Sequence, residues 1–480
     1  MAETRRSPGP RNSAWSGGWR ALHALVAAAI VAFYAWTAWT DSRPWHWTGP
    51  RTDYSNQLLH GFLSGRLSMV VPSDPATFDY NARYAMWRPP VMLDVSRYHG
   101  SDYLYFGVAP IVTLFLPWRL LTGQDLPEPA AVVFLFSAGF WLQLAWLARI
   151  RRAFAPSTGP AAWLGLLLAV GLGNVAAATL VRPLVYECAM GSAYLWSMAS
   201  LLALTGAVLT PEKAVRSLAL ASAAFGLAVA SRPNLLPAGI AIAVAAIALA
   251  RASVSAQRWQ ILAAALAPAA LIGAGLAAYN FARFGGPLDF GFGYQQNNSN
   301  PASVFAPQWL GFKLRAYFAA WPAFNGWFPY LELPSQANGP AGYWGTETVL
   351  GQPQLWPWLV ALGASTALAL RRPNGSACVL SVAFAAWFVG AFLPTALFGG
   401  WTVRYCVDFV PVLITGAGWL VMSGLANPSV AKRALARAGL GWLLVGAAYN
   451  FLLSFQSEVG SPGRDAAAVA PVGAFFDAAS

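Results

Sequence analysis

The sequence is poor in charge and in cysteine. Only 10% of its 480 residues are charged, against about 25% in soluble globular proteins, and this excludes an ordinary soluble fold. The three cysteines, Cys188, Cys378 and Cys406, lie far apart and fit neither a CxxC motif nor a zinc-site spacing. The sequence therefore predicts neither a disulfide framework nor a zinc site.

Motifs for nucleotide and metal chemistry are also missing. The chain has no P-loop, no GxGxxG motif that opens a helix after a strand, and no HExxH motif. It has no DxD motif, which would indicate a metal–nucleotide-sugar site, and its four histidines do not form a ligand pair four residues apart. We therefore expect no metal and no other cofactor.

What the sequence does contain is long apolar stretches. Hydrophobic residues make up 57% of the chain, and stretches of roughly 17 to 25 apolar residues recur along it. The formal net charge of +12 does not indicate nucleic-acid binding, because lysine and arginine occur in short clusters between the apolar stretches. The pattern predicts an all-α polytopic protein of the membrane with about 11–13 transmembrane helices, and its richness in Ala, Trp and Arg suggests a bacterial inner membrane.

The spans can be placed to within a few residues. They are 21–40, 104–121, 130–149, 161–180, 188–209, 215–231, 235–250, 260–280, 354–370, 377–397, 408–424 and 438–456. We predict a cytoplasmic tail at 1–20, a single transmembrane domain at 21–456 and a C-terminal tail at 457–480. The first span has no small-residue cleavage site after it, so we interpret it as an uncleaved signal-anchor.

Basic clusters give the orientation. They place the N-terminus and five later loops in the cytoplasm: Arg5, Arg6, Arg11, Arg20; Arg149, Arg151, Arg152; Lys213, Arg216; Arg251, Arg258; Arg371, Arg372; Lys432, Arg433, Arg437. Two long loops, 41–103 and 281–353, then face the outside, as does the C-terminal tail. One conflict remains, because three spans before Arg149 would place it outside. Either 104–121 is re-entrant or the long loop hides another crossing.

Asp53 is the first candidate for chemistry. It precedes an amphipathic helical pattern, LLHGFLSGRL, in the first outer loop. An Asp at this position commonly caps the helix N-terminus. It can also act as a general base that takes a proton from an attacking hydroxyl at the membrane surface. Both interpretations fit the sequence.

Glu187 is the second candidate. It is the only acid near the start of a span between residues 129 and 211. Acidic residues in or near spans are costly and often functional. Pairing with Arg182, about one turn away, is the structural alternative.

Outward-facing arginines form a third set, because the positive-inside rule disfavours them there. Their planar fork suits bidentate phosphate recognition. For Arg404 in the phrase GGWTVRYCVDF, a structural ion pair with Asp408 at helical spacing is the alternative. The set comprises Arg88, Arg97, Arg182, Arg232, Arg283 and Arg404.

Five phrases of the sequence suggest a family. They are TDYSNQLLHGFLSGRL, YLYFGVAPIVTLFLPWRLLTG, SRPNLLPAG, YNFARFGGPLDFGFGY and RYCVDFVPVL. With the layout of two outer loops they resemble the bacterial GT-C superfamily of glycosyltransferases, in its protein O-mannosyltransferase, aminoarabinose-transferase and lipid-A sugar-transferase branch. In this chain Asp53 is followed by Tyr54 where the family often has an acidic pair, and Glu187 matches the family's second acid approximately.

The resemblance implies short interfacial helices in the outer loops and transfer of a sugar from a polyprenyl-phosphate donor. The acceptor would be a lipid, a glycan or a protein on the periplasmic face, with Asp53 and Glu187 as catalytic acids. Arg404, Arg88, Arg97, Arg182 and Arg283 would bind the donor phosphate. A transporter or flippase for a lipid-linked glycan is one alternative, and a non-catalytic subunit of an envelope-assembly complex is another.

Overall fold

The computed structural model describes most of the transmembrane part of the chain. The described residues are 15–38, 54–70, 95–181, 183–295, 304–326, 328–332, 351–371, 375–400 and 402–455. Of the residues predicted to carry function, Asp53, Arg88 and Arg182 lie outside these ranges.

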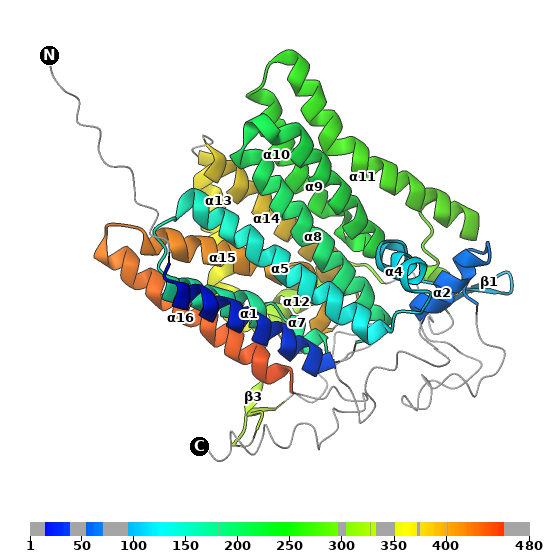
Figure 1. Ribbon diagram of the computed structural model, residues 1–480, viewed down its shortest axis with the longest axis horizontal. Coiled ribbons are helices and arrows are strands. Elements are labelled where there is room, and N and C mark those ends of the chain that lie inside the picture. Colours follow the sequence, from blue (N-terminus) through cyan, green and yellow to red (C-terminus); the bar gives the residue numbers. More distant parts are fainter. Residues whose placement is uncertain are drawn as a thin grey trace.

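The structure is a bundle of helices (Figure 1). In chain order these are α1 (Gly17–Ala38), α2 (Tyr54–Leu63), α4 (Leu116–Thr122), α5 (Glu128–Phe154), α6 (Pro160–Leu172), α7 (Ala176–Thr179), α8 (Val185–Leu209), α9 (Ala214–Ser231), α10 (Ile240–Arg251), α11 (Ser255–Phe284), α12 (Trp309–Phe318), α13 (Trp356–Arg371), α14 (Ser376–Leu397), α15 (Val410–Leu425) and α16 (Val430–Leu453). Short 3₁₀ helices join several of them: η3 (Pro211–Lys213), η4 (Pro233–Gly239), η5 (Phe292–Tyr294), η7 (Pro353–Leu355) and η8 (Val403–Asp408). A π-helical turn, η2 (Ile111–Phe115), precedes α4.

The predicted fold class is confirmed. Within the described residues, nine helices are long and apolar enough to cross a membrane. Two further helices, α13 and α15, have 16 residues each and are lengthened at their N-termini by η7 and η8. If these two are counted with the nine, the described residues hold eleven candidate crossings, the lower end of the predicted range, and the chain is an integral membrane protein.

The helix order resolves the conflict before Arg149. The predicted span 104–121 is wrong, because its helical part covers only Ile111–Thr122, about 18 Å at 1.5 Å per residue. Two crossings, α1 and α5, therefore precede the basic end of α5. The Arg151 guanidinium lies 4.4 Å from the Trp15 ring centre, beside the start of α1.

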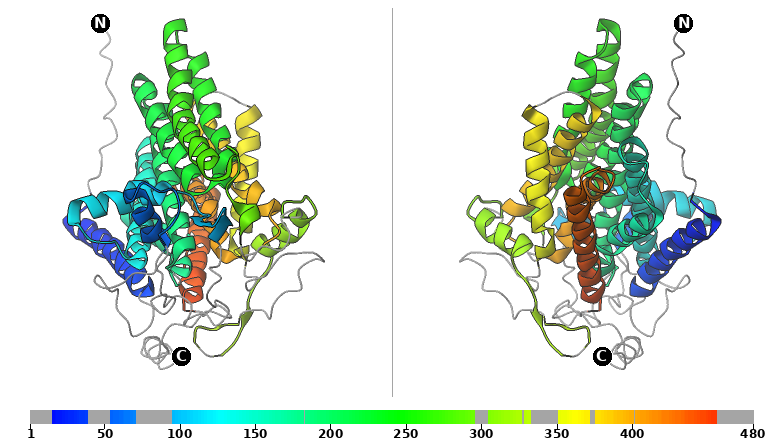
Figure 2. Two further views of the ribbon diagram at one scale, coloured as in Figure 1. Left: turned by 90° about the vertical axis from the view of Figure 1, so that its right-hand side faces the viewer. Right: turned by 90° about the vertical axis from the view of Figure 1, so that its left-hand side faces the viewer.

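Counting eleven crossings in order places the lysine and arginine clusters of the described residues at one end of the bundle. We call this end the basic end, and the opposite end the site end. The α10–α11 connection is at the basic end and the β3–β4 hairpin projects from the site end (Figure 2). Helices from the two ends of the chain also meet, since the Phe33 and Phe451 rings are 5.0 Å apart.

The third crossing is broken between α6 and α7. Gly173 and Asn174 leave the helix, and Val175 has a positive φ of 59°. Side-chain amides satisfy the freed backbone, because Asn174 Oδ1 accepts from Ala176 N–H at 3.0 Å and Asn450 Nδ2 donates to Gly173 O at 3.2 Å. Such satisfaction is required where a helix breaks inside a membrane.

The two long loops pack against each other at the site end. In the first, β1 (Val95–Tyr98) and β2 (Ser101–Leu104) form an antiparallel hairpin. In the second, β3 (Ala323–Phe324) pairs with β4 (Leu331–Glu332). The loops meet where Ser96 bridges to Gln295 and where Ser96 Oγ donates to Gly291 O at 2.7 Å. The described parts of the two long loops therefore contact each other directly.

Candidate active site

Glu187 lies in the first turn of α8, at the site end. Its carboxylate oxygen Oε2 accepts the N–H of Leu184, the residue before the helix, at 3.1 Å. An acid at this position also complements the positive end of the helix dipole. The side chain is completely buried, so its charge needs a partner.

Arg404 provides that partner. Its Nη1 forms a short ion pair with Oε1 of Glu187, and both side chains are almost inaccessible to solvent. Arg404 is also held by its own loop, because Nε donates to Thr402 Oγ1 at 3.0 Å. The Tyr186 ring lies 5.2 Å from the guanidinium carbon. A buried pair of this kind fixes both groups, since each would be unpaired without the other.

Asp408 pairs with a different arginine. Its Oδ2 accepts from Arg232 Nη2 at 2.9 Å and from Asn234 Nδ2 at 2.9 Å. Arg404 and Asp408 both belong to η8, a 3₁₀ helix with three residues per turn. Residues four apart therefore point in different directions, and the alternative pairing of Arg404 with Asp408 is wrong. Instead η8 is held on two sides, by α8 and by the α9–η4 junction.

Arg283 differs from the other arginines. It lies in the last turn of α11 and is buried. Within the described residues it donates to neutral oxygens only, Leu104 O at 3.1 Å and Asn280 Oδ1 at 2.7 Å. Its Nε has no hydrogen-bond partner, and its guanidinium lies 3.9 Å from the Tyr279 ring centre. Among the four described arginines of the predicted set, Arg97, Arg232 and Arg404 each form an ion pair with a carboxylate. Within the described residues Arg283 forms no such pair, although the Asp289 carboxylate acts on it electrostatically.

The segment Leu104–Gly107 joins these groups. Leu104 O receives Arg283, and the Phe106 ring lies 4.8 Å from Tyr186, the neighbour of Glu187. Gly107 packs against the backbone of Ala230 and Ser231, just before Arg232. Four residues span at most about 14 Å, so the two ion pairs and Arg283 belong to one region of the site end.

Gly107 makes a close approach that no larger residue allows. A Cβ at this position would lie 2.2 Å from Ala230 O and 2.3 Å from Ser231 O. We expect Gly107→Ala to push the Leu104–Gly107 segment away from α9 and to lower the melting temperature by several degrees, as overpacking costs about 1–3 kcal/mol. Thermal unfolding in detergent measures this. Gly293→Ala is the matched control, because nothing lies within 4 Å of its Cβ, and an equal loss in both variants would contradict the prediction.

The remaining predicted residues lie elsewhere or outside the described chain. Arg97 sits on the β1–β2 hairpin and forms a two-pronged pair with Asp102, at 2.8 and 2.9 Å, with about half of its side chain exposed. This exposed ion pair agrees with the structural interpretation of an outward-facing arginine, in which the arginine pairs with a neighbouring carboxylate. Asp53, Arg88 and Arg182 keep their predicted roles as hypotheses.

Glu128 is an acid that the sequence interpretation missed. It is buried at the first position of α5, one residue before the region searched for acids. Its Oε1 accepts from Ser55 N at 2.9 Å and from Ser55 Oγ at 2.6 Å. Glu128 therefore binds a first-turn N–H of α2, a role that the structural interpretation gave to Asp53. A predicted boundary two residues earlier would have revealed it.

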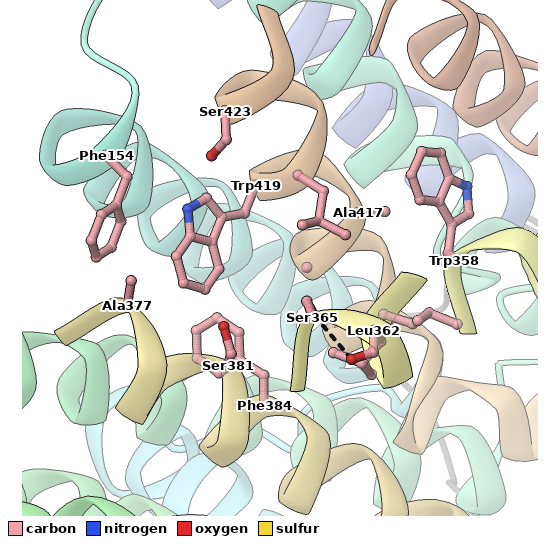
Figure 3. Close-up of a pocket in the computed structure, with 13 residues that line it drawn as sticks. Phe154, Trp358, Leu362, Ser365, Ala377, Ser381, Phe384, Ala417, Trp419 and Ser423 are labelled. Atoms are coloured by element: carbon pink, nitrogen blue, oxygen red, sulfur yellow. Dashed lines mark hydrogen bonds between the residues drawn. The ribbon is translucent and has the colours of Figure 1, made fainter. Parts of the chain in front are cut away.

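A cavity of about 270 Å³ lies away from this region (Figure 3). It is lined by residues of α13, α14 and α15 and by Phe154 at the end of α5. Its lining is apolar apart from serine hydroxyls and carries no charged side chain. It is therefore distinct from the cluster of charges at the site end. In the described part of the chain, no three His, Cys, Asp or Glu side chains are grouped to hold a metal ion.

Comparison with known proteins gives matches among solved structures only. No family model and no curated protein matches the chain. ArnT from Cupriavidus metallidurans, bound to undecaprenyl phosphate, is similar over 95% of this chain and 80% of its own, with 13% identity and a TM-score of 0.47. An oligosaccharyltransferase from Archaeoglobus fulgidus in its apo form is similar over 94% of this chain and 57% of its own, with 12% identity and a TM-score of 0.43. Both are GT-C glycosyltransferases, the group that the sequence phrases resemble.

Proposed function

We propose that the protein transfers a sugar from a polyprenyl-phosphate-linked donor to a lipid, glycan or protein acceptor on the outer face of the membrane. The positive-inside rule assigns the basic end to the cytoplasm and the site end to the outside. The charged cluster then lies at the ends of spans, at the depth of lipid headgroups. A donor that is itself a membrane lipid reaches this position without entering the solvent.

Arg283 is the observation that carries the proposal. A buried cation without a hydrogen-bonded carboxylate is costly. Asp289 offsets only part of the desolvation of Arg283, and an anion from a ligand would supply a direct partner. Within the described residues the Nε of Arg283 has no hydrogen-bond partner, and its two terminal nitrogens donate to neutral oxygens. A phosphate ester at the headgroup depth supplies the charge that Arg283 lacks, and arginine binds phosphate through paired N–H donors. One of the similar structures contains undecaprenyl phosphate, and we propose a donor of that class for this chain.

The chemistry is a displacement at the anomeric carbon. The acceptor oxygen forms a bond to this carbon while the bond to the phosphate oxygen breaks, with inversion of configuration. The electron pair of the broken bond goes to the polyprenyl phosphate, whose developing charge Arg283 stabilises. The acceptor proton passes to Asp53, which we propose as the general base.

Glu187 supports the site electrostatically in this proposal. Both of its carboxylate oxygens are occupied, one by Leu184 N–H and one by Arg404. It would have to give up these contacts to accept a proton. We therefore assign it to the placement of Arg404 next to the donor phosphate, while Asp53 takes the proton.

Binding of undecaprenyl phosphate to purified protein tests the donor class. We expect Arg283→Gln to weaken binding about 10- to 100-fold. A hydrogen bond to a charged group contributes about 1.5–3 kcal/mol, which corresponds to this loss of affinity. Arg283→Lys should retain only part of the affinity for the lipid, because lysine lacks the planar fork of the guanidinium group. Titration in detergent micelles, read by intrinsic tryptophan fluorescence, measures the affinity.

Arg97→Gln is the matched control for this experiment. It removes a loop arginine from an exposed pair, which is worth about 0–1 kcal/mol, so binding should change less than about fivefold. If Arg283→Gln binds the lipid as tightly as the parent, the phosphate does not use Arg283 and the proposed function loses its main support.

The break between α6 and α7 favours a second candidate, a transporter or flippase, because such proteins use discontinuous helices. In this chain the break is satisfied internally by Asn174 and Asn450. Reconstituted vesicles with donor lipid and acceptor separate the two functions. Movement of the lipid between leaflets without sugar transfer would favour the transporter.

A further inference from the structure

Lys313 is a buried cation outside the contacts described so far. It lies on α12, in the second long loop, and its side chain is completely buried. Its Nζ forms a short hydrogen bond to the carbonyl oxygen of Gly400. The Tyr317 ring, one turn along the same helix, is 5.5 Å from Nζ. A lysine is almost never fully buried in this way without a specific role.

Gly400 belongs to the short connection between α14 and η8. The chain just before α12 pairs with the same connection, because Ala306 N donates to Leu397 O at 2.9 Å and Gly399 N to Val304 O at 2.6 Å. Thr402, two residues after Gly400, then holds Arg404 through its hydroxyl. A continuous path of contacts therefore runs from α12 to Arg404 and Glu187.

We propose that Lys313 is a positioning residue that fixes Gly400, which follows the end of α14, to α12 and thereby sets the place of η8. Because η8 carries both Arg404 and Asp408, loss of this contact would loosen both ion pairs together. The second long loop would thus control the geometry of the charged cluster without touching the reacting atoms. The part of this proposal that concerns donor binding rests on the proposed function.

The surroundings of Lys313 make the contact sensitive to pH. Burial lowers the pKa of Lys313 to about 7, although the Cys406 thiol raises it. Tyr317 faces Lys313 from its own helix, and Asp408 and Tyr449 both interact with Cys406. The packed elements α14 and η7 bring no titratable side chain to this end, since Cys378 of α14 lies at the basic end.

The sign follows from linkage. In an opened loop Lys313 would regain its ordinary pKa of about 10.4, so closing the loop releases a proton between that value and about 7. The closed arrangement therefore gains stability as pH rises from about 7 and loses it again as pH falls toward 7. Below about pH 7 Lys313 is protonated in both the closed and the opened loop, so its contribution to the stability of the closed arrangement no longer changes with pH.

Labelling of the Cys406 thiol by a maleimide tests the proposal. Cys406 is free and completely buried on η8, so it reacts only when η8 opens. We expect Lys313→Met to accelerate labelling about fivefold or more at pH 9, because Gly400 O would be left unsatisfied in the closed state. The acceleration should shrink toward pH 7. Peptide mass spectrometry identifies the labelled cysteine.

Two features of the chain sharpen this experiment. Arg315→Met is the matched control, since it removes a positive charge from the exposed side of the same helix. Cys406 is completely buried in the closed arrangement, so faster labelling reports opening of η8. If Lys313→Met does not fold, the wild-type protein provides a second test. The rate at which Cys406 is labelled, divided by the rate for Cys378, should fall between pH 7 and pH 9, because the closed arrangement gains stability over this range.

The outcomes separate this inference from the proposed function. Equal labelling of Cys406 in Lys313→Met and the parent at pH 9, or a wild-type ratio that does not fall with pH, overturns the positioning role. Faster labelling in a protein that binds no undecaprenyl phosphate confirms the positioning role and removes the proposed function instead. With both intact, the KM for the donor should rise in Lys313→Met while kcat stays within about twofold, because η8 holds the binding groups.

Discussion

Glu187→Gln is expected to destabilise the protein by about 3–5 kcal/mol, because Arg404 would remain buried without a carboxylate. The pair is almost inaccessible to solvent on both sides, so water cannot compensate. Glutamine keeps the shape of the side chain and can still accept the Leu184 N–H. The loss would therefore report the missing charge, and thermal unfolding in detergent would show it as a lower melting temperature.

A double-mutant cycle tests the origin of this loss. Replacing both partners, as Glu187→Gln with Arg404→Met, should recover a large part of the stability, since no unpaired charge remains. The exposed pair Arg97–Asp102 is the control, where Asp102→Asn should cost at most about 1 kcal/mol. Strictly additive losses for Glu187 and Arg404 would show that the two side chains do not stabilise each other.

The pairing itself could not be predicted from the sequence. Arg404 and Asp408 have the spacing of neighbours on an α-helix, and this spacing suggested an ion pair between them. The segment forms a 3₁₀ helix instead, whose geometry turns the two side chains apart. Each then finds a partner that is far away in the sequence, 217 residues for Arg404 and 176 for Asp408. Periodicity contains no information about such contacts.

The membrane topology was more predictable. Apolar length and charge clusters depend on the bilayer rather than on tertiary contacts, so eight of the nine long helices agree with a predicted span to within about five residues at each end. The ninth, α16, begins at Val430, eight residues before the predicted start at 438. Helix α11 is longer than expected at both ends and carries Arg283 into the loop region at its last turn. The error at 104–121 was visible in the sequence as a charge conflict at Arg149, and the short helix that ends at Thr122 removes it.

Side chains at the ends of spans were the hardest to interpret. Glu128 was missed because a span boundary was placed two residues too late. Lys313 was missed because α12 lies in an aromatic loop, where a lysine is expected to face solvent. Both are buried only because the two long loops pack over the bundle, and this is a tertiary effect that local composition does not express.

Asp53→Asn is expected to reduce sugar transfer about 100- to 10,000-fold, the usual cost of losing a general base. Asp53 directly precedes α2, and asparagine caps a helix about as well as aspartate. The start of α2 is also held from α5, because Glu128 binds both the N–H and the hydroxyl of Ser55. The helix should therefore stay in place when the charge of Asp53 is removed.

Three measurements on Asp53→Asn show whether a loss of activity comes from the missing charge or from a disturbed fold. Transfer of sugar from the polyprenyl-phosphate donor should fall, while the melting temperature and the affinity for undecaprenyl phosphate stay close to those of the parent. Asp74→Asn, in the same loop, is the matched control and should keep near-parental activity. Transfer at the parental rate by Asp53→Asn would remove it as the base and leave Glu187 as the next candidate. That outcome would require Glu187 to give up Arg404 or Leu184 N–H during the reaction, and the Glu187–Arg404 cycle would then show a change in kcat as well as in stability.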